Sequence, residues 1–379
     1  MASDRIPQLD VLRAVAVLLV IATHMDRPSA AVAWPLRLLL EPWQRGGWTG
    51  VDLFFVLSGF LISGLLFAEY RRHGSLRVGR FLIRRGFKIY PPFYVFLAVT
   101  MVAYLSFSHV SGRLLRDFAV EAVYLQSYVP AIWEHTWSLA VEEHFYVLLP
   151  LLLLGLMRRR PGVPDPFRPL LVIVPVAGAV ALGARIATLL LGPIAQWRNF
   201  TPTHLRLDEL LWGVLLGYLY HFHRERTEAF AKAHGHRLLV LAVVLIAPSF
   251  VLLPLSPYNL TVGRSLLALG CGWLVVWGVL HAGATLSGRV GRALARVGFY
   301  SYSIYLWHLM VSRWGLLPLR RGAVLADLPA TAAYLVNITL YVAGALVVGI
   351  AMAKVVETRS LALRDRLFPS RAPAVPLAG

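Results

Sequence analysis

A stretch of apolar residues from Val11 to Met25 contains two side chains with chemistry of their own, Arg13 and His24. A charged side chain in the core of a bilayer costs roughly 2.5–3.5 kcal/mol, so membrane helices retain such residues mainly where they serve a function. In an α-helix, a step of about eleven residues rises about 16 Å and completes about three turns, which places both side chains on one face at two depths. Considered alone, a snorkelling arginine and an interfacial histidine would explain the pair equally well.

Further ionisable residues lie near the ends of four other apolar stretches. They are Asp52 in GVDLFF; Glu142, Glu143 and His144 in TWSLAVEEHFY; Arg206, Asp208 and Glu209 in LRLDELLWG; and His308 in SYSIYLWH. Facing lipid, each would carry the same penalty, whereas around a shared polar cavity they can pair. Clusters of His, Glu and Asp side chains are typical of sites that transfer protons, so the pattern predicts such a site within the membrane.

Basic residues gather ahead of the third apolar stretch, in RFLIRRGFKIYPP. Arg80, Arg84 and Lys88 are four residues apart and share a helical face, and Arg85 lies one turn before Lys88. Two interpretations stay open: cytoplasmic loops attract positive charge in any membrane protein, or these cations bind the phosphates of a ligand. A basic inner entrance below a proton-handling site fits a long ligand with a phosphate-rich head and a reactive far end, as in a coenzyme A thioester.

The composition places these residues in a membrane. Of 379 residues, 58% are hydrophobic and 15% are charged. Apolar stretches of about 20 residues recur along the chain, each long enough to cross a bilayer core of roughly 30 Å. We therefore predict an all-α, polytopic integral membrane protein with about ten transmembrane helices. The expected spans are 9–26, 50–69, 89–107, 137–157, 169–191, 205–222, 237–254, 260–281, 297–314 and 328–353.

The distribution of charge predicts the orientation of these spans. The chain has 37 Lys and Arg residues against 19 Asp and Glu, a net charge of +18. Most of the basic residues fall on one side of the expected spans, which predicts that both termini are cytoplasmic. These loops account for most of the charge, so we expect no nucleic acid partner. We expect a transmembrane domain over 1–356 and a disordered, basic and Pro-rich cytoplasmic tail over 357–379.

The same motifs make the chain similar to a known family. LDVLRAVAVLLVIATH, GVDLFFVLSGFLI, RRGFKIYP, WSLAVEEHFY, RLDELLWG and SYSIYLWH follow one another in the order found in the acyltransferase 3 family of membrane O-acyltransferases, which the chain resembles over about residues 6–355. The resemblance implies a multi-pass enzyme of the inner (plasma) membrane. Such an enzyme transfers an acyl group, usually acetyl, to envelope glycans, glycolipids or small glycosylated molecules.

The resemblance also implies roles for individual residues. His24 is expected to be catalytic with Glu142 orienting its imidazole, and acyl-CoA is expected to contact Arg13, Arg85 and Lys88. Arg84 is added to these expected contacts from its place in the basic stretch, beside Arg85. Depth in the membrane and position in the motifs assign substrate binding to Asp52, Glu143, Asp208, Glu209 and His308. The chain departs from the family at Lys88, where arginine is commoner, and at His144, where glutamine is usual. The lysine keeps the charge but loses bidentate phosphate binding.

The expected reaction takes an acyl group from cytoplasmic acyl-CoA to a hydroxyl group outside the membrane, and no metal is expected. Two chemical routes stay open. Neutral His24 either deprotonates the acceptor hydroxyl or takes the acyl group itself and passes it on. A proton-coupled transporter or a flippase of an envelope-glycan precursor is the alternative from another class, since transporters also carry Asp, Glu and His within the membrane. The acceptor, the acyl group and the oligomeric state are not determined by the sequence.

Overall fold

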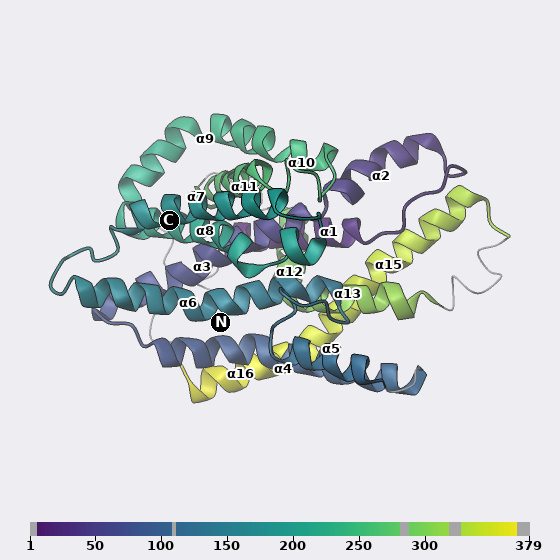
Figure 1. The fold of residues 1–379 in the computed structure, drawn as a ribbon, viewed down its shortest axis with the longest axis horizontal. Coiled ribbons are helices and arrows are strands. Elements are labelled where there is room, and N and C mark those ends of the chain that lie inside the picture. The colour runs from purple at the N-terminus through teal and green to yellow at the C-terminus, as the bar shows by residue number, and fades with distance from the viewer. Residues whose placement is uncertain (1–5, 108–110, 281–287, 318–326, 370–379) are drawn as a thin grey trace.

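The computed structural model describes residues 6–107, 111–280, 288–317 and 327–369, and all regular structure in these ranges is helical. The long helices run along the long axis of the molecule, and consecutive ones are antiparallel (Figure 1). The predicted all-α fold is thereby confirmed. One end of the molecule, on the left in Figure 1, carries Arg71, Arg72, Arg158 and Arg224 at the ends of helices. We call it the basic end.

Seven helices within the described ranges are long and apolar enough to cross a membrane, consistent with a polytopic protein. They are α3 (Thr49–His73), α4 (Val78–Phe107), α6 (Trp137–Arg159), α7 (Leu170–Leu190), α9 (Arg224–Ile246), α11 (Val262–Leu280) and α15 (Ala330–Met352). The three other expected spans coincide with shorter helices: α1 (Pro7–Thr23), α8 (Leu207–Phe222) and α13 (Ser301–Met310). The total of ten spans and the cytoplasmic termini stay predictions.

Shorter helices complete the described structure. They are α2 (Trp34–Gly46), α5 (Gly112–Ala122), α10 (Pro248–Val251), α12 (Arg289–Phe299) and α16 (Thr358–Leu367), and one-turn helices include η1 (Glu134–Thr136). The α12 and α13 helices are separated by a break at Tyr300, where the backbone leaves helical geometry (φ −96°, ψ 7°). The ninth expected span is therefore not one straight helix.

Helices α3 and α8 pack with their backbones in contact, which fixes the centre of the bundle. A Cβ atom on Gly59 would lie 1.9 Å from the carbonyl oxygen of Leu210, and one on Gly213 would lie 2.2 Å from that of Val56. Small residues at facing positions allow membrane helices to approach this closely. The positions of the polar residues on α3 and α8 are consequently set by backbone contact.

Helix α4 continues through Pro91, and this has a consequence for the end of the chain. Proline has no backbone N–H, so the carbonyl four residues earlier, that of Phe87, has no helical donor. The hydroxyl of Ser360 on α16 donates a hydrogen bond of 2.5 Å to this carbonyl. Helix α16 thus lies against α4 (Figure 1). This differs from the expected disorder of the tail from residue 357, of which residues 370–379 lie outside the described ranges.

Candidate active site

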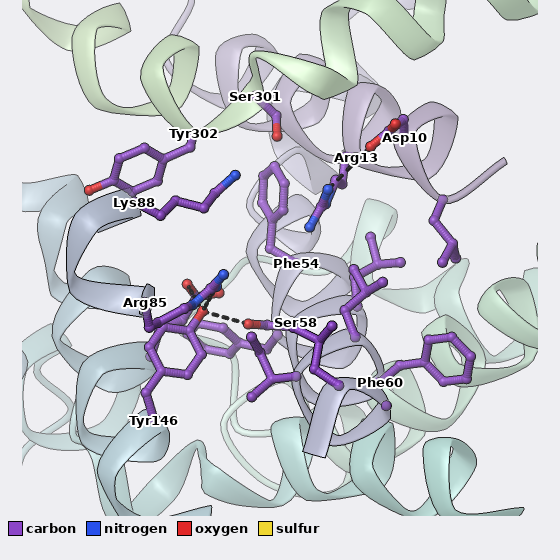
Figure 2. Close-up of a pocket in the computed structure, with 18 of the residues that line it drawn as sticks. Asp10, Arg13, Phe54, Ser58, Phe60, Arg85, Lys88, Tyr146, Ser301 and Tyr302 are labelled. Atoms are coloured by element: carbon purple, nitrogen blue, oxygen red, sulfur yellow. Dashed lines mark hydrogen bonds and ion pairs between the residues drawn. The ribbon is translucent and has the colours of Figure 1, made fainter. Parts of the chain in front are cut away.

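A cavity of about 340 Å³ lies between α1, α3, α4, α6 and α13. Its lining includes four residues expected at the site: Arg13, Arg85, Lys88 and Glu142. Figure 2 shows the cationic groups of Arg13, Arg85 and Lys88 directed toward a common space beside Phe54. The structure therefore brings together residues that are more than 70 positions apart in the sequence.

Tyr146 is at the centre of a hydrogen-bond network in this cavity. Arg85 donates a 2.6 Å hydrogen bond to the hydroxyl oxygen of Tyr146, which in turn donates to Oε2 of Glu142 at 2.7 Å. The hydroxyl of Ser58 lies 2.7 Å from the same oxygen, and the guanidinium of Arg85 stands 4.3 Å from the centre of the Tyr146 ring. The network holds the cation of Arg85 in place within the cavity.

The other two cations in the lining are each paired with a carboxylate. Arg13 lies 3.1 Å from Asp10, one turn earlier on α1. Lys88 lies 3.3 Å from Glu357, which also accepts a 2.7 Å hydrogen bond from the hydroxyl of Ser303. Side chains at partly exposed positions retain access to a ligand while their carboxylate partners fix their direction.

Arg84 does not line the cavity, whereas Arg13, Arg85 and Lys88 do. Its guanidinium lies 3.3 Å from Asp365 of α16 and donates to the backbone carbonyl of Phe368. Arg80 likewise donates to the carbonyl of Pro369. At two of the three positions in the series Arg80, Arg84 and Lys88, the side chain therefore contacts the last turn of α16 or the two residues that follow it.

His24 caps the C-terminal end of α1, at the end of the helix opposite to Arg13. Its Nδ1 lies 2.8 Å from the carbonyl oxygen of Val20. A carbonyl oxygen can only accept, so Nδ1 carries the proton, and in the neutral ring Nε2 holds the free lone pair. The backbone thus sets the tautomer in which Nε2 of His24 is the reactive atom.

Two further histidine rings lie near His24. The His308 ring on α13 lies 5.1 Å from that of His24, and the His135 ring in η1 lies 5.0 Å from that of His308. Both are almost fully buried. The sequence points to His308 through its motif but not to His135, although that residue stands one position before TWSLAVEE. Within the described ranges, no group of His, Cys, Asp or Glu has the geometry to hold a metal ion.

Glu142 and His24 are not in contact in the structure. Glu142 is bonded to Tyr146, and His24 to the backbone of its own helix. The reason is depth, since Glu142 lies more than a turn along α6 toward the basic end, whereas His135, just before this helix begins, lies at the level of His24. In place of the expected pairing of carboxylate and imidazole, the structure has a carboxylate in the cavity with the three cations and a group of imidazoles beyond it.

The cavity ends close to the histidines without reaching them. Ser138 and Tyr305 line it, their hydroxyls lie 2.6 Å apart, and that of Tyr305 donates to the backbone carbonyl of His135 at 2.7 Å. The Tyr305 ring lies 5.5 Å from the ring of His135 and 5.7 Å from that of His308. The cavity and the histidines are therefore separated by the thickness of one aromatic side chain.

Residues 6–354 match the model of a family that is described as an acyltransferase domain, the acyltransferase 3 family. The chain belongs to this family. The resemblance inferred from the six motifs is thereby confirmed, and with it a place among the membrane acyltransferases.

Relatives of this acyltransferase 3 chain include the peptidoglycan O-acetyltransferase OatA of Listeria monocytogenes, 29% identical over 324 residues, which are 80% of this chain and 49% of the relative. A putative O-acetyltransferase of Staphylococcus aureus strain COL is 28% identical (81% and 50%). The O-acetyltransferase OatA of Staphylococcus aureus strain NCTC 8325 is 27% identical (80% and 50%). The chain spans about half the length of these curated relatives. No solved structure matches it.

Three acidic residues of the acyltransferase 3 motifs lie outside the cavity, in fully buried ion pairs. Arg206 lies 3.1 Å from Asp52 and 3.1 Å from Glu209, and Arg185 lies 2.5 Å from Asp208. All five side chains are completely inaccessible. In this structure these carboxylates are paired with arginines and shielded from the cavity, and their expected role in substrate binding stays a prediction.

The remaining two polar residues of the fourth motif also face away from the cavity of this acyltransferase 3 chain. Glu143 interacts with Tyr90 of α4, and neither residue belongs to the lining. His144 lies 2.8 Å from the hydroxyl of Thr203. Of the polar residues in WSLAVEEHFY, Ser138, Glu142 and Tyr146 line the cavity, at the spacing of one helical turn.

Proposed function

We propose that this chain is a multi-pass O-acyltransferase of the plasma membrane. It takes an acyl group, most simply acetyl, from acyl-CoA bound at the basic end, and transfers it to a hydroxyl of an extracytoplasmic glycan. Membership of the acyltransferase 3 family supports the reaction class. The relatives named O-acetyltransferases, one of them a peptidoglycan O-acetyltransferase, support the acyl group and the kind of acceptor.

The observation that carries this proposal is the position of the cavity. It collects three cations, Arg13, Arg85 and Lys88, and extends to within one aromatic side chain of the histidines. Guanidinium and ammonium groups bind phosphates through charge-assisted hydrogen bonds. A coenzyme A thioester has its phosphates at one end and its reactive carbonyl at the other, so it fits a site that is basic at one end and leads toward imidazoles.

The proposed reaction needs the Tyr305 side chain to move, because Tyr305 lines the cavity and lies against His135 and His308, the second of which contacts His24. Once the thioester carbonyl lies beside His24, the acceptor oxygen forms the new C–O bond and the C–S bond breaks. The hydroxyl proton leaves with an imidazole, and it ends on the sulfur of coenzyme A. A neutral Nε2 on His24 can act in this step as base or as nucleophile.

The test uses the purified full chain in detergent or lipid nanodiscs. Labelled acetyl-CoA is supplied together with soluble peptidoglycan fragments, and ester formation is measured. His24→Ala is expected to reduce transfer at least about 100-fold, while acetyl-CoA still raises the unfolding temperature of this variant. Arg85→Ala is expected to lose that stabilisation. Undiminished transfer by His24→Ala would remove this histidine from the reaction.

A second acyl donor without nucleotide phosphates tests whether the three cations bind those phosphates. S-acetylpantetheine carries the same thioester and lacks the nucleotide phosphates. If Arg13, Arg85 and Lys88 bind those phosphates, their alanine variants raise the KM for acetyl-CoA but leave the use of S-acetylpantetheine unchanged. If the variants lose activity with both donors to the same extent, the three cations do not act by binding the phosphates. Transport of a glycan without any response to acetyl-CoA would instead favour the transporter or flippase.

A further inference from the structure

Three histidines at the end of the cavity each have one ring nitrogen bonded to a backbone carbonyl. Nδ1 of His24 lies 2.8 Å from the Val20 oxygen, Nδ1 of His308 lies 2.5 Å from the Tyr305 oxygen, and Nε2 of His135 lies 3.1 Å from the Leu306 oxygen. Because carbonyls only accept, each bonded nitrogen carries the proton. In the neutral rings, the lone pairs are therefore on Nε2 of His24, Nε2 of His308 and Nδ1 of His135.

The lone pair of His308 has no partner in the part of the chain that the structure describes. His308 is completely buried, and its Nε2 makes no hydrogen bond. A buried acceptor without a donor costs about 1–3 kcal/mol, and such exceptions in a native structure call for an explanation. An apolar ring would fill the same space without this cost. The position of His308 beside His24 supplies a chemical reason for a basic nitrogen there.

The charged groups around this pair do not provide another base. Glu142 is bonded to Tyr146 on the donor side, and Glu134 is paired with Arg313 at 3.2 Å. No carboxylate in the described ranges is hydrogen-bonded to His24 or His308. The ring of His308 packs against that of His24, with the ring centres 5.1 Å apart and the planes at 65°.

One histidine cannot be acylated and deprotonate the acceptor at the same time. If Nε2 of His24 attacks the thioester, that nitrogen loses its lone pair to the new C–N bond. A second base is then required for the acceptor hydroxyl. In a direct transfer, by contrast, His24 alone suffices and a second basic nitrogen would have no role. The presence of two adjacent free lone pairs therefore favours the covalent route.

We propose that His24 is the nucleophile and His308 the general base of a two-step transfer. This inference rests on the proposed function. In the first step Nε2 of His24 forms a bond to the acyl carbon, the C–S bond breaks, and the coenzyme A thiolate leaves. The product is an acylimidazolium whose Nδ1–H remains on the Val20 carbonyl.

In the second step, the acceptor oxygen attacks the acyl carbon while its proton moves to Nε2 of His308. The C–O bond forms, the C–N bond breaks, and His24 returns to its neutral state. The proton on His308 is finally released and balances the thiolate formed in the first step. The net products are the ester and the free thiol, with no further reactant.

The experiment separates the two steps by leaving the acceptor out. The full-length protein is mixed with labelled acetyl-CoA alone, and we measure released thiol and label retained on the protein, which hydroxylamine removes from an acylimidazole. The single cysteine of the chain, Cys271, is buried, which limits the thiol background. Wild-type protein is expected to release close to one equivalent of thiol per active chain before acceptor is added.

The decisive variant is His308→Gln, in which an amide oxygen can accept a hydrogen bond but not a proton. The thiol burst and the label on the protein are expected to persist, while transfer to peptidoglycan fragments falls at least about 100-fold. His144→Gln is the matched control, because it makes the same change outside the histidine group and is expected to keep both steps. Acetyl-CoA must still stabilise each variant against heat, which shows that it is folded.

The outcomes distinguish this inference from the function on which it rests. If wild-type protein transfers acetyl without any burst or retained label, the covalent route is overturned and the proposed function stands. If His308→Gln loses the burst together with transfer, or loses neither, the role of His308 as the base of the second step is overturned and the proposed function stands. If His24→Ala retains full transfer, the proposed active site itself fails, whatever His308 does.

Discussion

Arg13 and His24 share one helix, but their partners come from different ends of the molecule. Arg13 faces the cavity beside Asp10, and His24 meets α13 and η1 at the other end of α1. The sequence predicts that Arg13 and His24 lie at different depths, because their separation along the helix depends only on helical spacing. It does not predict the partners of His24, since these depend on how α13 and the segment before α6 pack against α1.

The side chain of Tyr305 closes the cavity and should limit the size of the acyl group. Tyr305→Ala is expected to raise the kcat/KM ratio of butyryl-CoA to acetyl-CoA about tenfold, because each added methylene in a pocket changes discrimination by roughly 1–3 kcal/mol. Taking a ratio removes the effect of partial unfolding. The control is Phe60→Ala, which widens the same cavity at a different place. Phe60 lies about two turns along α3 from Phe54, the residue that contacts Tyr305, so this variant should leave the ratio unchanged.

The buried ion pairs should act on stability rather than on binding. Asp208→Asn leaves the charge of Arg185 without its partner, and breaking a buried pair costs about 3–5 kcal/mol. We expect a lower free energy of unfolding and an unchanged KM for acetyl-CoA and for peptidoglycan fragments. The exposed pair of Arg45 and Glu41 is the comparison: Glu41→Gln should cost less than about 1 kcal/mol. A raised KM for the acceptor at normal stability would restore a substrate role for Asp208.

At the scale of helices, the contact between α3 and α8 should be sensitive to a single methyl group. In Gly59→Ala the added Cβ would overlap the Leu210 carbonyl oxygen at 1.9 Å. The two helices would have to separate, at a cost of about 1–3 kcal/mol. Chemical or thermal unfolding in detergent measures this loss.

The control for this prediction is a glycine in open space. A Cβ on Gly155 of α6 meets no atom within 4 Å. Gly155→Ala should therefore be neutral or stabilise the helix by up to about 1 kcal/mol, since alanine has the higher helix propensity. Equal effects of the two substitutions would show that the close approach of α3 and α8 does not hold in the protein.

Periodicity identifies most of the helices, because long apolar stretches leave few alternatives in a membrane. It fails where contact between helices decides the outcome. The ninth expected span is broken at Tyr300, and helix α16 forms beyond the expected end of the bundle because α4 offers it Arg84 and the carbonyl of Phe87. Neither contact leaves a periodic signal in the sequence.

The candidate site shows the same limit. Arg13, Arg85, Lys88 and Glu142 could be predicted as a group because each stands in a recognisable motif, and the structure brings them to one cavity. Asp52 and Asp208 stand in equally recognisable motifs, yet they are paired and buried. An ionisable residue within a membrane indicates that a partner exists, but the sequence does not say whether the partner is a ligand or another helix.

For the molecule as a whole, the contact of α16 with α4 should support donor binding. A chain ending at Glu357 keeps the partner of Lys88 but loses Ser360 and Asp365, which hold the basic end of α4. We expect the KM for acetyl-CoA to rise about tenfold with little change in kcat, and the use of S-acetylpantetheine to stay constant. The double variant Ser360→Ala and Asp365→Asn should also raise the KM for acetyl-CoA, but by less than the truncation does. An unchanged KM in both proteins would contradict this role.

The hydrogen bond from Ser360 to the Phe87 carbonyl of α4 can form only late in biosynthesis. The segment around Phe87 leaves the ribosome long before residue 360 does, so the carbonyl of Phe87 stays without its partner until translation has passed α16. A partly made chain in the translocon would therefore have a histidine end but no completed entrance.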